Sequence, residues 1–408
     1  MIYLDYAAAA PMTAAARDAF AAASEIVGNP AAAHALGRKL HDDIEVERAF
    51  LASLLEAAAF SAAPESDESD LARSDLDVWT KQDAAFIFCS SLTEANNMIW
   101  RGLTLRPADE IFFSPADHPS LTKAQEFYQA MPEIKVRPLP LMRGRLDETA
   151  FYAQLGPQTK LVLLSSVNNT CGLINPVERW SWEIKRRAPQ ALIHLDHGQG
   201  FLKHPLGAHC LDSMAVPSTK IGGPGGIAGL WVRQRKNWRP WLYGGGHEYN
   251  LRSSSLAYPL IKAFAAAVRT QVPHLAEQVK QTAALKQSFQ QSLRQQVPEV
   301  RFPVEEVDST TPTANFSPLI TLALFPKVSS DILMRYLERE EIMVAASSAC
   351  SSHVKGFDPV LAALGLAAEC HKNVLRFSWS ANHSAQDLHT VAERVAIHYR
   401  ALAKFAGR

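Results

Sequence analysis

The sequence is electrically balanced and rich in apolar residues, which excludes several classes of protein. Its 408 residues include 41 Lys and Arg, 41 Asp and Glu, and 47% hydrophobic residues. Proteins that bind nucleic acid or an anionic membrane surface normally carry a basic excess, so we expect neither partner here. The length is enough for two or three domains with sizeable cores.

The chain gives no sign of export or of a membrane segment. It opens with "MIYLDYAAAAP", which lacks the basic region and the long apolar stretch of a signal peptide. No apolar run reaches the roughly 18–20 residues that span a bilayer. The cysteines are scattered and odd in number, so neither a disulfide framework nor a structural zinc site is expected. They are Cys89, Cys171, Cys210, Cys350 and Cys370. We therefore expect a reduced, cytoplasmic, enzyme-sized protein without a metal site.

Short apolar runs of strand length alternate with helix-like stretches through the first part of the chain. Runs that are apolar throughout are typical of strands buried on both faces of a sheet. Their alternation with helices predicts an α/β layer architecture with a largely parallel sheet. The predicted strands cover 85–90, 110–115, 160–167, 191–196, 213–218 and 229–233, and the predicted helices cover 93–103, 119–130 and 176–187.

The texture of the sequence changes near residue 258, which indicates a second domain. The elements predicted there are a long helix over 258–296, strands at 319–325 and 373–379, and a closing helix near 385–405. We expect a large α/β domain over 15–257 and a small α+β domain formed by 1–14 and 258–408. Residues 61–83 are rich in Ser, Asp and Glu and interrupt the large domain, so we interpret them as a solvated insertion.

Two residues at the ends of predicted strands favour pyridoxal 5'-phosphate (PLP) chemistry. Asp196 ends a buried strand, at the edge where α/β sheets bind ligands. Lys220, in "PSTKIGGPGG", follows some 24 residues later at the end of the next strand. PLP enzymes hold the protonated ring nitrogen with an aspartate and attach the cofactor through a lysine. The alternative is a surface lysine beside a flexible turn, since a P-loop lysine would follow its glycines.

Two further stretches lie at the same predicted edge of the sheet. "SSLTEANN" places small residues and Thr93 at a helix N-terminus, which suits a phosphate group. Ordinary helix capping by Ser90, Ser91 or Thr93 is the alternative. His118, in "DHPS", is either a structural histidine or a ring stacked on a flat cofactor.

A lone cysteine near the C-terminus has unusual neighbours. Cys350 lies in "VAASSACSSHVKG", residues 344–356, among serines and alanines that cannot form a core. A buried cysteine normally keeps apolar company. Cys350 is therefore either an unremarkable loop residue or a thiol that a reactant has to reach.

These motifs belong to a set of ten landmarks that run almost from end to end of the chain. They are "IYLDYAAAAP", "GNPAAAHALGR", "TEANN", "DHPS", "SVNNTCG", "LDHGQ", "STKIGGPGGI", "GGGHEYNLRSSS", "SSACSS" and "LRFS". In this order they resemble the cysteine desulfurases of the NifS/IscS type, within the class V aminotransferase group of fold-type I PLP enzymes. The resemblance implies a large domain with a mostly parallel seven-stranded sheet and a smaller C-terminal α+β domain.

The resemblance also implies PLP as the cofactor and gives each binding residue a role. Lys220 is the implied attachment point, Asp196 pairs with the pyridine nitrogen, and His118 stacks on the ring. Gln199 hydrogen-bonds the phenolic oxygen. The residues expected around the phosphate are Leu92, Thr93, Ser218, Thr219 and Ser255. Ser255 matches a hydroxyl residue that reaches the phosphate of the neighbouring subunit, so a homodimer is expected.

For the reaction, the resemblance implies L-cysteine as substrate and alanine as product. Asn169 and Arg376 position the substrate, Arg376 by a bidentate grip on its carboxylate. Cys350 matches a nucleophile on a flexible loop, which attacks the substrate sulfur and becomes a persulfide. A sulfur-acceptor protein is an expected partner, in iron–sulfur cluster or tRNA thiolation pathways.

Several positions depart from the family pattern and leave other functions open. Thr219 stands where a histidine usually precedes the lysine, and Pro217 where a phosphate-binding serine is common. Leu92 replaces a glycine of the phosphate stretch. One alternative is another class V PLP enzyme, an aminotransferase or a selenocysteine lyase, in which Cys350 is incidental. The other is an inactive protein of the same fold that serves as a scaffold.

Overall fold

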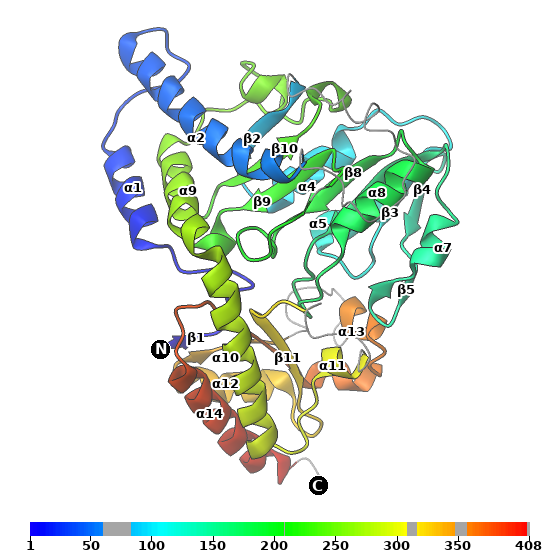
Figure 1. Ribbon diagram of the computed structural model, residues 1–408, viewed down its shortest axis with the longest axis vertical. Coiled ribbons are helices and arrows are strands. Elements are labelled where there is room, and N and C mark those ends of the chain that lie inside the picture. The colour runs from blue at the N-terminus through cyan, green and yellow to red at the C-terminus, as the bar shows by residue number, and fades with distance from the viewer. Residues whose placement is uncertain (60–82, 208, 308–315, 347–356, 406–408) are drawn as a thin grey trace.

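The largest element of the fold is a seven-stranded sheet in the order β2-β10-β9-β8-β7-β3-β4 (Figure 1). The structure is a computed structural model that describes residues 1–59, 83–207, 209–307, 316–346 and 357–405. All neighbouring strands are parallel except β10, which is antiparallel to both β2 and β9. The strands are β2 (Ala85–Cys89), β3 (Glu110–Phe113), β4 (Lys135–Pro138), β7 (Thr159–Ser165), β8 (Leu192–Asp196), β9 (Ser213–Pro217) and β10 (Ala228–Val232). The predicted mostly parallel, seven-stranded sheet is confirmed.

Helices cover both faces of this sheet and bury its apolar side chains. On one face, strand residues such as Phe86 and Ile193 share a core with α1, α2, α7, α8 and α9. On the other face, Ile87 and Leu163 share a core with α4, α5 and α6. Successive side chains of a strand point to opposite faces, so a three-layer arrangement requires strands that are apolar throughout. The helices are α1 (Ala14–Ser24), α2 (Ala35–Ala59), α4 (Leu92–Gly102), α5 (Pro119–Thr122), α6 (Ala124–Tyr128), α7 (Glu148–Tyr152), α8 (Val177–Arg187) and α9 (Tyr258–Gln271).

A smaller antiparallel sheet, in the order β11-β14-β13, organises the C-terminal part of the chain. The N-terminal strand β1 joins this part by pairing in parallel with β12. Helices α10, α12 and α14 share its core, while α11 and α13 lie on a separate apolar cluster. The elements are β1 (Ile2–Tyr3), β11 (Ile320–Leu324), β12 (Ile342–Met343), β13 (Ala345–Ala346), β14 (Val374–Ser378), α10 (Leu275–Gln296), α11 (Pro303–Val307), α12 (Ser330–Glu338), α13 (Pro359–Ala363) and α14 (Ala385–Ala403), beside a hairpin of β5 (Leu141–Met142) and β6 (Arg145–Leu146).

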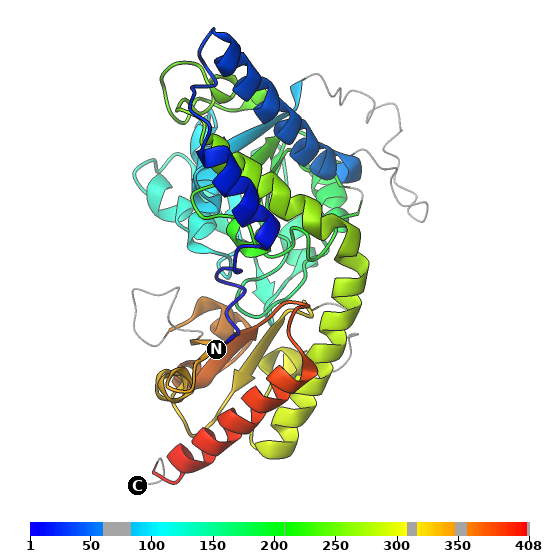
Figure 2. The ribbon, with the colours of Figure 1, turned by 90° about the vertical axis from the view of Figure 1, so that its left-hand side faces the viewer.

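The helical segment predicted over 258–296 is confirmed in its bounds, and a 3₁₀ turn at Val272–His274 divides it into α9 and α10. Pro273 lies in this turn, and a proline has no N–H to continue a helix and clashes with the preceding turn. The two helices follow one another along both parts of the molecule (Figure 2). α9 packs into the core of the large sheet and α10 into the core of the small one. The predicted domain boundary at residue 258 therefore stays a prediction, with α9 packed on the large sheet.

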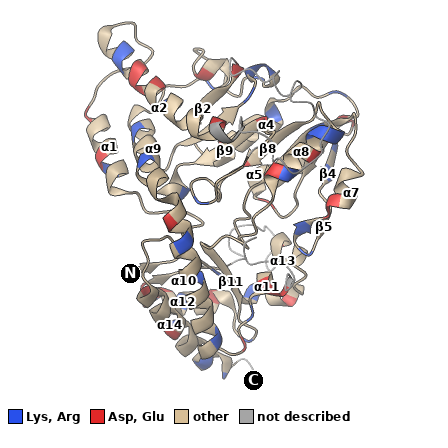
Figure 3. Ribbon diagram, viewed as in Figure 1, with Lys and Arg blue, Asp and Glu red and all other residues tan. Residues whose placement is uncertain are grey.

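Charge is distributed evenly over the fold. Lys and Arg are interspersed with Asp and Glu on both the large and the small part (Figure 3). Within the described residues, no helix is both long and apolar enough to cross a bilayer. Residues 60–82 lie outside the described ranges, so the solvated insertion expected over 61–83 stays a prediction.

Phe264 on α9 provides a test of this packing. Its side chain is fully buried in the core of the large sheet. Phe264→Ala should lower the free energy of unfolding by about 3–5 kcal/mol, because it removes a large apolar group and leaves a cavity. Urea unfolding followed by tryptophan fluorescence measures the change. Ile332→Ala on α12, where the side chain is 48% exposed, is the control and should change stability by less than about 0.5 kcal/mol. Equal effects of the two substitutions would contradict the packing.

Candidate active site

A cavity of about 210 Å³ opens at the carboxyl ends of the central strands. Asp196 ends β8, Lys220 follows β9, and His118 follows β3. Because these strands are parallel, their carboxyl ends meet at one edge of the sheet and bring the three residues together. The predicted site residues that line the cavity are Leu92, Thr93, His118, Asn169, Asp196, Gln199, Thr219 and Lys220.

The Asp196 carboxylate is held by two neutral donors. Its Oδ2 accepts a hydrogen bond from Asn96 Nδ2 at 2.7 Å, and its Oδ1 accepts one from the Gly198 N–H at 2.8 Å. No described cation hydrogen-bonds to it, so its charge remains available to a cationic partner in the cavity. A carboxylate that has only neutral hydrogen-bond donors can pair with a protonated ring nitrogen.

A chain of polar side chains extends from Asp196 and fixes proton positions. The Asn96 amide nitrogen donates to Asp196 and to Ser120 Oγ, so Asn96 Oδ1 is an acceptor. His194 Nε2, 2.9 Å from that oxygen, must therefore carry the proton, and its Nδ1 accepts from the Ser213 hydroxyl. Burial lowers the pKa of His194 to about 4, against the opposing effect of Asp196, which keeps this ring neutral. Asn96 is thus oriented as a donor toward Asp196.

Lys220 lies in a tight 3₁₀ turn, Thr219–Ile221, directly after β9. Burial lowers its pKa, an effect that Asp196 opposes and Arg376 reinforces. A lower pKa increases the fraction of neutral amine, which is the form that reacts with an aldehyde.

The space between Lys220 and Asp196 exists because residue 198 is glycine. A Cβ atom at Gly198 would lie 2.7 Å from Asp196 Oδ1, 2.7 Å from Leu92 Cδ2 and 3.5 Å from Lys220 Nζ. Any other residue would therefore fill the space between the carboxylate and the amine. The cradle has the position and the polar ends that a pyridine ring carrying an aldehyde requires.

His118 and its neighbour Asp117 both line this cavity. His118 Nδ1 accepts a hydrogen bond from the Ser120 N–H, and burial lowers its pKa against the opposing effect of Asp196. The ring is therefore neutral at neutral pH. Burial, reinforced by Asp196, raises the pKa of Asp117 to about 7, although the Ser165 hydroxyl donates to its Oδ1 at 2.5 Å. The other Asp117 oxygen is buried without a hydrogen-bond partner.

A second cavity, of about 160 Å³, adjoins the first and is bordered by Arg376 from β14. The two cavities share Asp117, His118, Asn169 and Lys220. Arg376 Nη2 donates to Asp5 Oδ1 at 2.7 Å, and Nη1 donates to the Asn169 carbonyl at 3.0 Å. Its Nε is buried and has no partner among the residues that the structure describes, so the guanidinium keeps a donor for a further acceptor.

The remaining predicted site residues differ in their placement. The Gln199 amide, on the wall of the first cavity, donates to the Ala7 carbonyl at 2.7 Å, which ties the N-terminal segment to the site. The Ser218 hydroxyl is fully buried beneath Gly223, has no hydrogen-bond partner in the described part of the chain and lines neither cavity. Cys350 lies outside the described residues. The predicted roles of these residues stay predictions.

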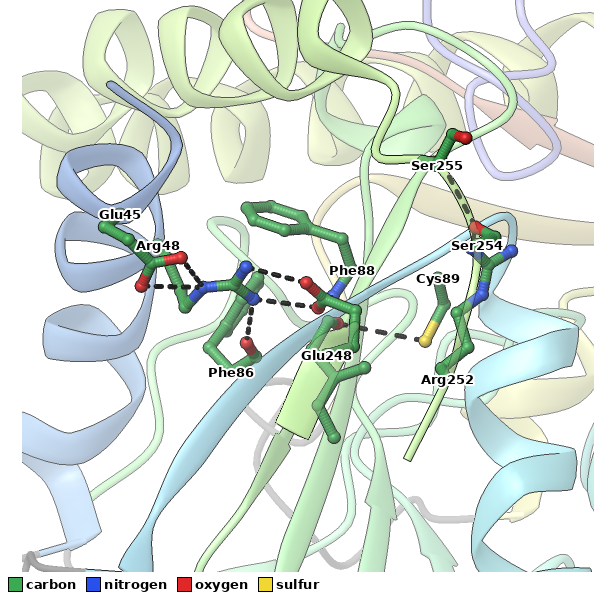
Figure 4. A network of polar contacts seen from close by, with 10 residues as sticks. Glu45, Arg48, Phe86, Phe88, Cys89, Glu248, Arg252, Ser254 and Ser255 are labelled. Atoms are coloured by element: carbon green, nitrogen blue, oxygen red, sulfur yellow. Dashed lines mark hydrogen bonds and ion pairs between the residues drawn. The ribbon is translucent and has the colours of Figure 1, made fainter. Parts of the chain in front are cut away.

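Ser255 is exposed at the end of a strap, which we define as residues 242–255 (Figure 4). A buried ion pair holds the strap, because Arg48 donates from both Nη atoms to Glu248 at 2.7 and 2.8 Å. Glu248 also accepts from the Phe88 N–H of β2 at 2.6 Å. The residues of the strap with a positive φ, Glu248 at 50°, Tyr249 at 57° and Asn250 at 63°, are strained for side chains other than glycine. The ion pair holds the backbone in that turn.

A second contact ties the strap to the helix that begins at the cavity. Arg252 donates to Glu94, in the first turn of α4, at 2.9 and 3.3 Å. Glu94 also accepts from the backbone N–H and the hydroxyl of Ser90. The strap and the predicted phosphate-binding turn therefore share one polar cluster.

Asn96, Asp117 and Asp5 are site residues that carried no separate signal in the sequence. Asn96 lies within "TEANN" and Asp5 within "IYLDYAAAAP", two of the landmark motifs. Membership of those motifs was the only feature of the sequence that could have marked Asn96 and Asp5 as site residues. Their partners, Asp196 and Arg376, are 100 and 371 residues away in the chain, and no local pattern indicates such pairs.

Comparison with known proteins agrees with this geometry. The family model described as aminotransferase class-V matches residues 68–391, which is most of the chain. The chain belongs to the class-V aminotransferase family. The cofactor of this protein is PLP, as the sequence predicted, and the Gly198 cradle between Asp196 and Lys220 fits the ring of that cofactor.

Individual relatives and solved structures resemble this chain over nearly its whole length. A putative cysteine desulfurase NifS from Bacillus subtilis is 25% identical over 394 residues, covering 95% of this chain and 92% of that protein. The structure of a NifS-like protein superposes with a TM-score of 0.82 at 22% identity and covers 98% of this chain and 100% of its own. A NifS-like protein from Rickettsia africae superposes with a TM-score of 0.78 at 24% identity, covering 98% and 99%.

The Arg48–Glu248 pair should stabilise this protein strongly. Glu248→Gln should lower the free energy of unfolding by about 3–5 kcal/mol, because it removes the fully buried counter-charge of Arg48 and leaves only the partly exposed Glu45 carboxylate on Arg48 Nε. Chemical denaturation measures this loss. Glu306→Gln, which removes the exposed partner of Arg301, is the matched control and should cost a small fraction of that. A loss from Glu248→Gln no larger than the control's would show that the buried pair does not hold the strap.

Proposed function

We propose that this protein is a PLP-dependent cysteine desulfurase that converts L-cysteine to L-alanine and keeps the sulfur as a persulfide on Cys350. The observation that carries the proposal is the meeting of two adjoining cavities at Lys220. One has the Asp196–Lys220 cradle for the cofactor, and the other has Arg376, whose Nε donor no described residue occupies. The relatives named cysteine desulfurase cover nearly the whole chain and support this choice of reaction.

The residues divide the work between holding the cofactor and holding the substrate. PLP, when bound, supplies an electron sink that makes the Cα proton of an amino acid acidic. When PLP is bound, Asp196 would hold its pyridine nitrogen and neutral His118 would contact its ring. Arg376 binds the substrate carboxylate, with Asp5 and the Asn169 carbonyl orienting its guanidinium. Lys220 accepts the Cα proton at Nζ, where burial favours the neutral amine.

Sulfur transfer uses the thiolate of Cys350. It attacks the substrate Sγ, so an S–S bond forms while the substrate Cβ–Sγ bond breaks. The electron pair of the broken bond remains with the Cβ carbon, which then takes a proton to give alanine. The resulting persulfide passes to a sulfur-acceptor protein. A serine and alanine neighbourhood such as that of Cys350 suits a thiol that has to meet two different reactants.

We also propose that the protein acts as a homodimer. Ser255 is exposed at the end of the strap, and two ion pairs, Arg48–Glu248 and Arg252–Glu94, fix that strap in place. A rigid, exposed strap is suited to present Ser255 to the phosphate group in a second copy of the chain.

Arg376→Lys tests the grip on the substrate carboxylate. Lysine presents a point charge and cannot make two parallel hydrogen bonds to a carboxylate. The KM for cysteine should rise at least about tenfold, since about 1.4 kcal/mol or more of binding is lost. Steady-state kinetics of alanine production measures this value. Arg301→Lys, an exposed arginine remote from the site, is the control. An unchanged KM in the Arg376 variant would show that another residue holds the carboxylate.

Cys350→Ser tests the reaction itself. The variant should still bind cysteine, seen as a change in the absorption spectrum of the holoenzyme, but should form no protein persulfide. Mass spectrometry of the wild-type enzyme after incubation with cysteine should find one additional sulfur atom on Cys350. Buried Cys89, Cys171 and Cys210 should stay unmodified and serve as internal controls.

Two outcomes would favour the alternative functions, another class V reaction or an inactive scaffold. A Cys350→Ser enzyme with a normal rate of alanine formation would show that the thiol is incidental, as in an aminotransferase or a selenocysteine lyase. Purified protein without a cofactor absorption band would indicate the inactive scaffold.

A further inference from the structure

A third cavity, of about 480 Å³, lies beside the active site and has no role in the proposed reaction. It is bordered by the N-terminal segment, the junction of α9 and α10, and the residues after β14. Lys220 borders this cavity as well as the two active-site cavities. A ligand here would therefore lie next to the lysine of the cofactor site.

The basic groups on the wall of this cavity have no acidic counterpart among the described residues. They are Arg17, Lys203, Lys220 and His274, and no described Asp or Glu lines the cavity. Lys220 is the proposed attachment point of the cofactor, so in the holoenzyme Arg17 and Lys203 are the groups that favour an anion over a cation here.

Lys203 is the basic group on this wall whose charge no described residue balances. Its side chain is half-buried and makes no hydrogen bond or ion pair with the residues that the structure describes. Burial, reinforced by Lys220, lowers the pKa of Lys203 to about 7. A half-buried lysine on a cavity wall that makes no contact with the described residues keeps its donors available for an acceptor from outside the chain.

The rest of the wall is apolar and partly aromatic. Leu202, Leu275, Leu319 and Trp379 contribute to it. The indole N–H of Trp379 is buried and finds no acceptor among the described residues, although buried indole N–H groups normally have one. Small-molecule sites combine such apolar walls with a few polar groups that fix orientation.

We propose that this cavity binds a small organic anion, with one carboxylate or phosphate group against Lys203 and an apolar or aromatic body against the leucines and Trp379. The proposal does not depend on the desulfurase reaction. A bound anion beside Lys203 would also lie next to Lys220, so its binding and the protonation of the cofactor site would be coupled in both directions.

Isothermal titration of the holoenzyme, without cysteine, tests the proposal with matched probes. Benzoate and phenyl phosphate each carry an anionic group on an aromatic body, and benzamide is the neutral counterpart of benzoate. Benzoate or phenyl phosphate should bind once per chain, and benzamide at least about tenfold more weakly, because it lacks the charge-assisted contact. The tighter of the two anions identifies the head group as carboxylate or phosphate. Because cysteine is absent, failure of the desulfurase proposal leaves this test intact.

Variants assign the binding to this cavity. Lys203→Met should weaken the preferred anion at least about tenfold, while Lys203→Arg should retain most of the affinity. Lys123→Met, an exposed lysine on the large part, is the control and should change nothing. The benzoate and benzamide comparison in the wild-type protein remains decisive if Lys203→Met does not fold.

Four results would overturn the proposal. The first is equal binding of benzoate and benzamide, and the second is unchanged affinity in Lys203→Met. The third is loss of binding in Arg376→Lys but not in Lys203→Met, which would place the anion in the substrate cavity. The fourth is no saturable binding of either aromatic anion at millimolar concentration. If inorganic phosphate binds as tightly as phenyl phosphate, the apolar wall does not contribute to binding, and the proposed apolar or aromatic body of the ligand is wrong.

Discussion

Asp196 is a buried carboxylate at the end of a central strand, and a buried carboxylate needs hydrogen-bond donors. The donors that Asp196 has fix the arrangement of the elements around it. Its two hydrogen-bond donors, the Asn96 amide and the Gly198 N–H, are neutral. They satisfy the oxygen atoms without cancelling the charge, so the carboxylate retains its attraction for a cation. Asn96 can donate only because neutral His194 occupies its oxygen. Helix α4, strand β8 and the loop after it are therefore held in one arrangement by a single charged group.

The substrate side depends on contacts between segments that are distant in sequence. Arg376 comes from the small sheet, Asp5 from the N-terminal segment and Asn169 from a loop of the large part. Gln199 holds the same N-terminal segment through the Ala7 carbonyl. A site assembled in this way responds to any shift of the small part relative to the large sheet. The polar contacts at Arg376 would be the first to change.

The sequence predicted the central strands and the meeting of Asp196, Lys220 and His118, because both follow from local pattern and from the common edge of parallel strands. It missed β4, whose residues Lys135–Pro138 lie at the sheet edge and lack the apolar pattern of a buried strand. It also missed the break at Pro273, since helical periodicity continues on both sides while the buried face changes core. Pairs such as Arg48–Glu248 have no local signal, because 200 residues separate the partners.

The first residues of the chain have a consequence for how the protein is made. Strand β1 pairs with β12, and Asp5 pairs with Arg376, which is synthesised 371 residues later. The large sheet can form during synthesis, since its strands are complete at Val232. Of the N-terminal segment, Ala7 then has its partner in Gln199, but β1 and Asp5 stay unpaired until the small sheet emerges. A ribosome-bound chain can thus hold a folded sheet and still lack its substrate site, so catalytic competence arrives only after β14, which carries Arg376, has been made.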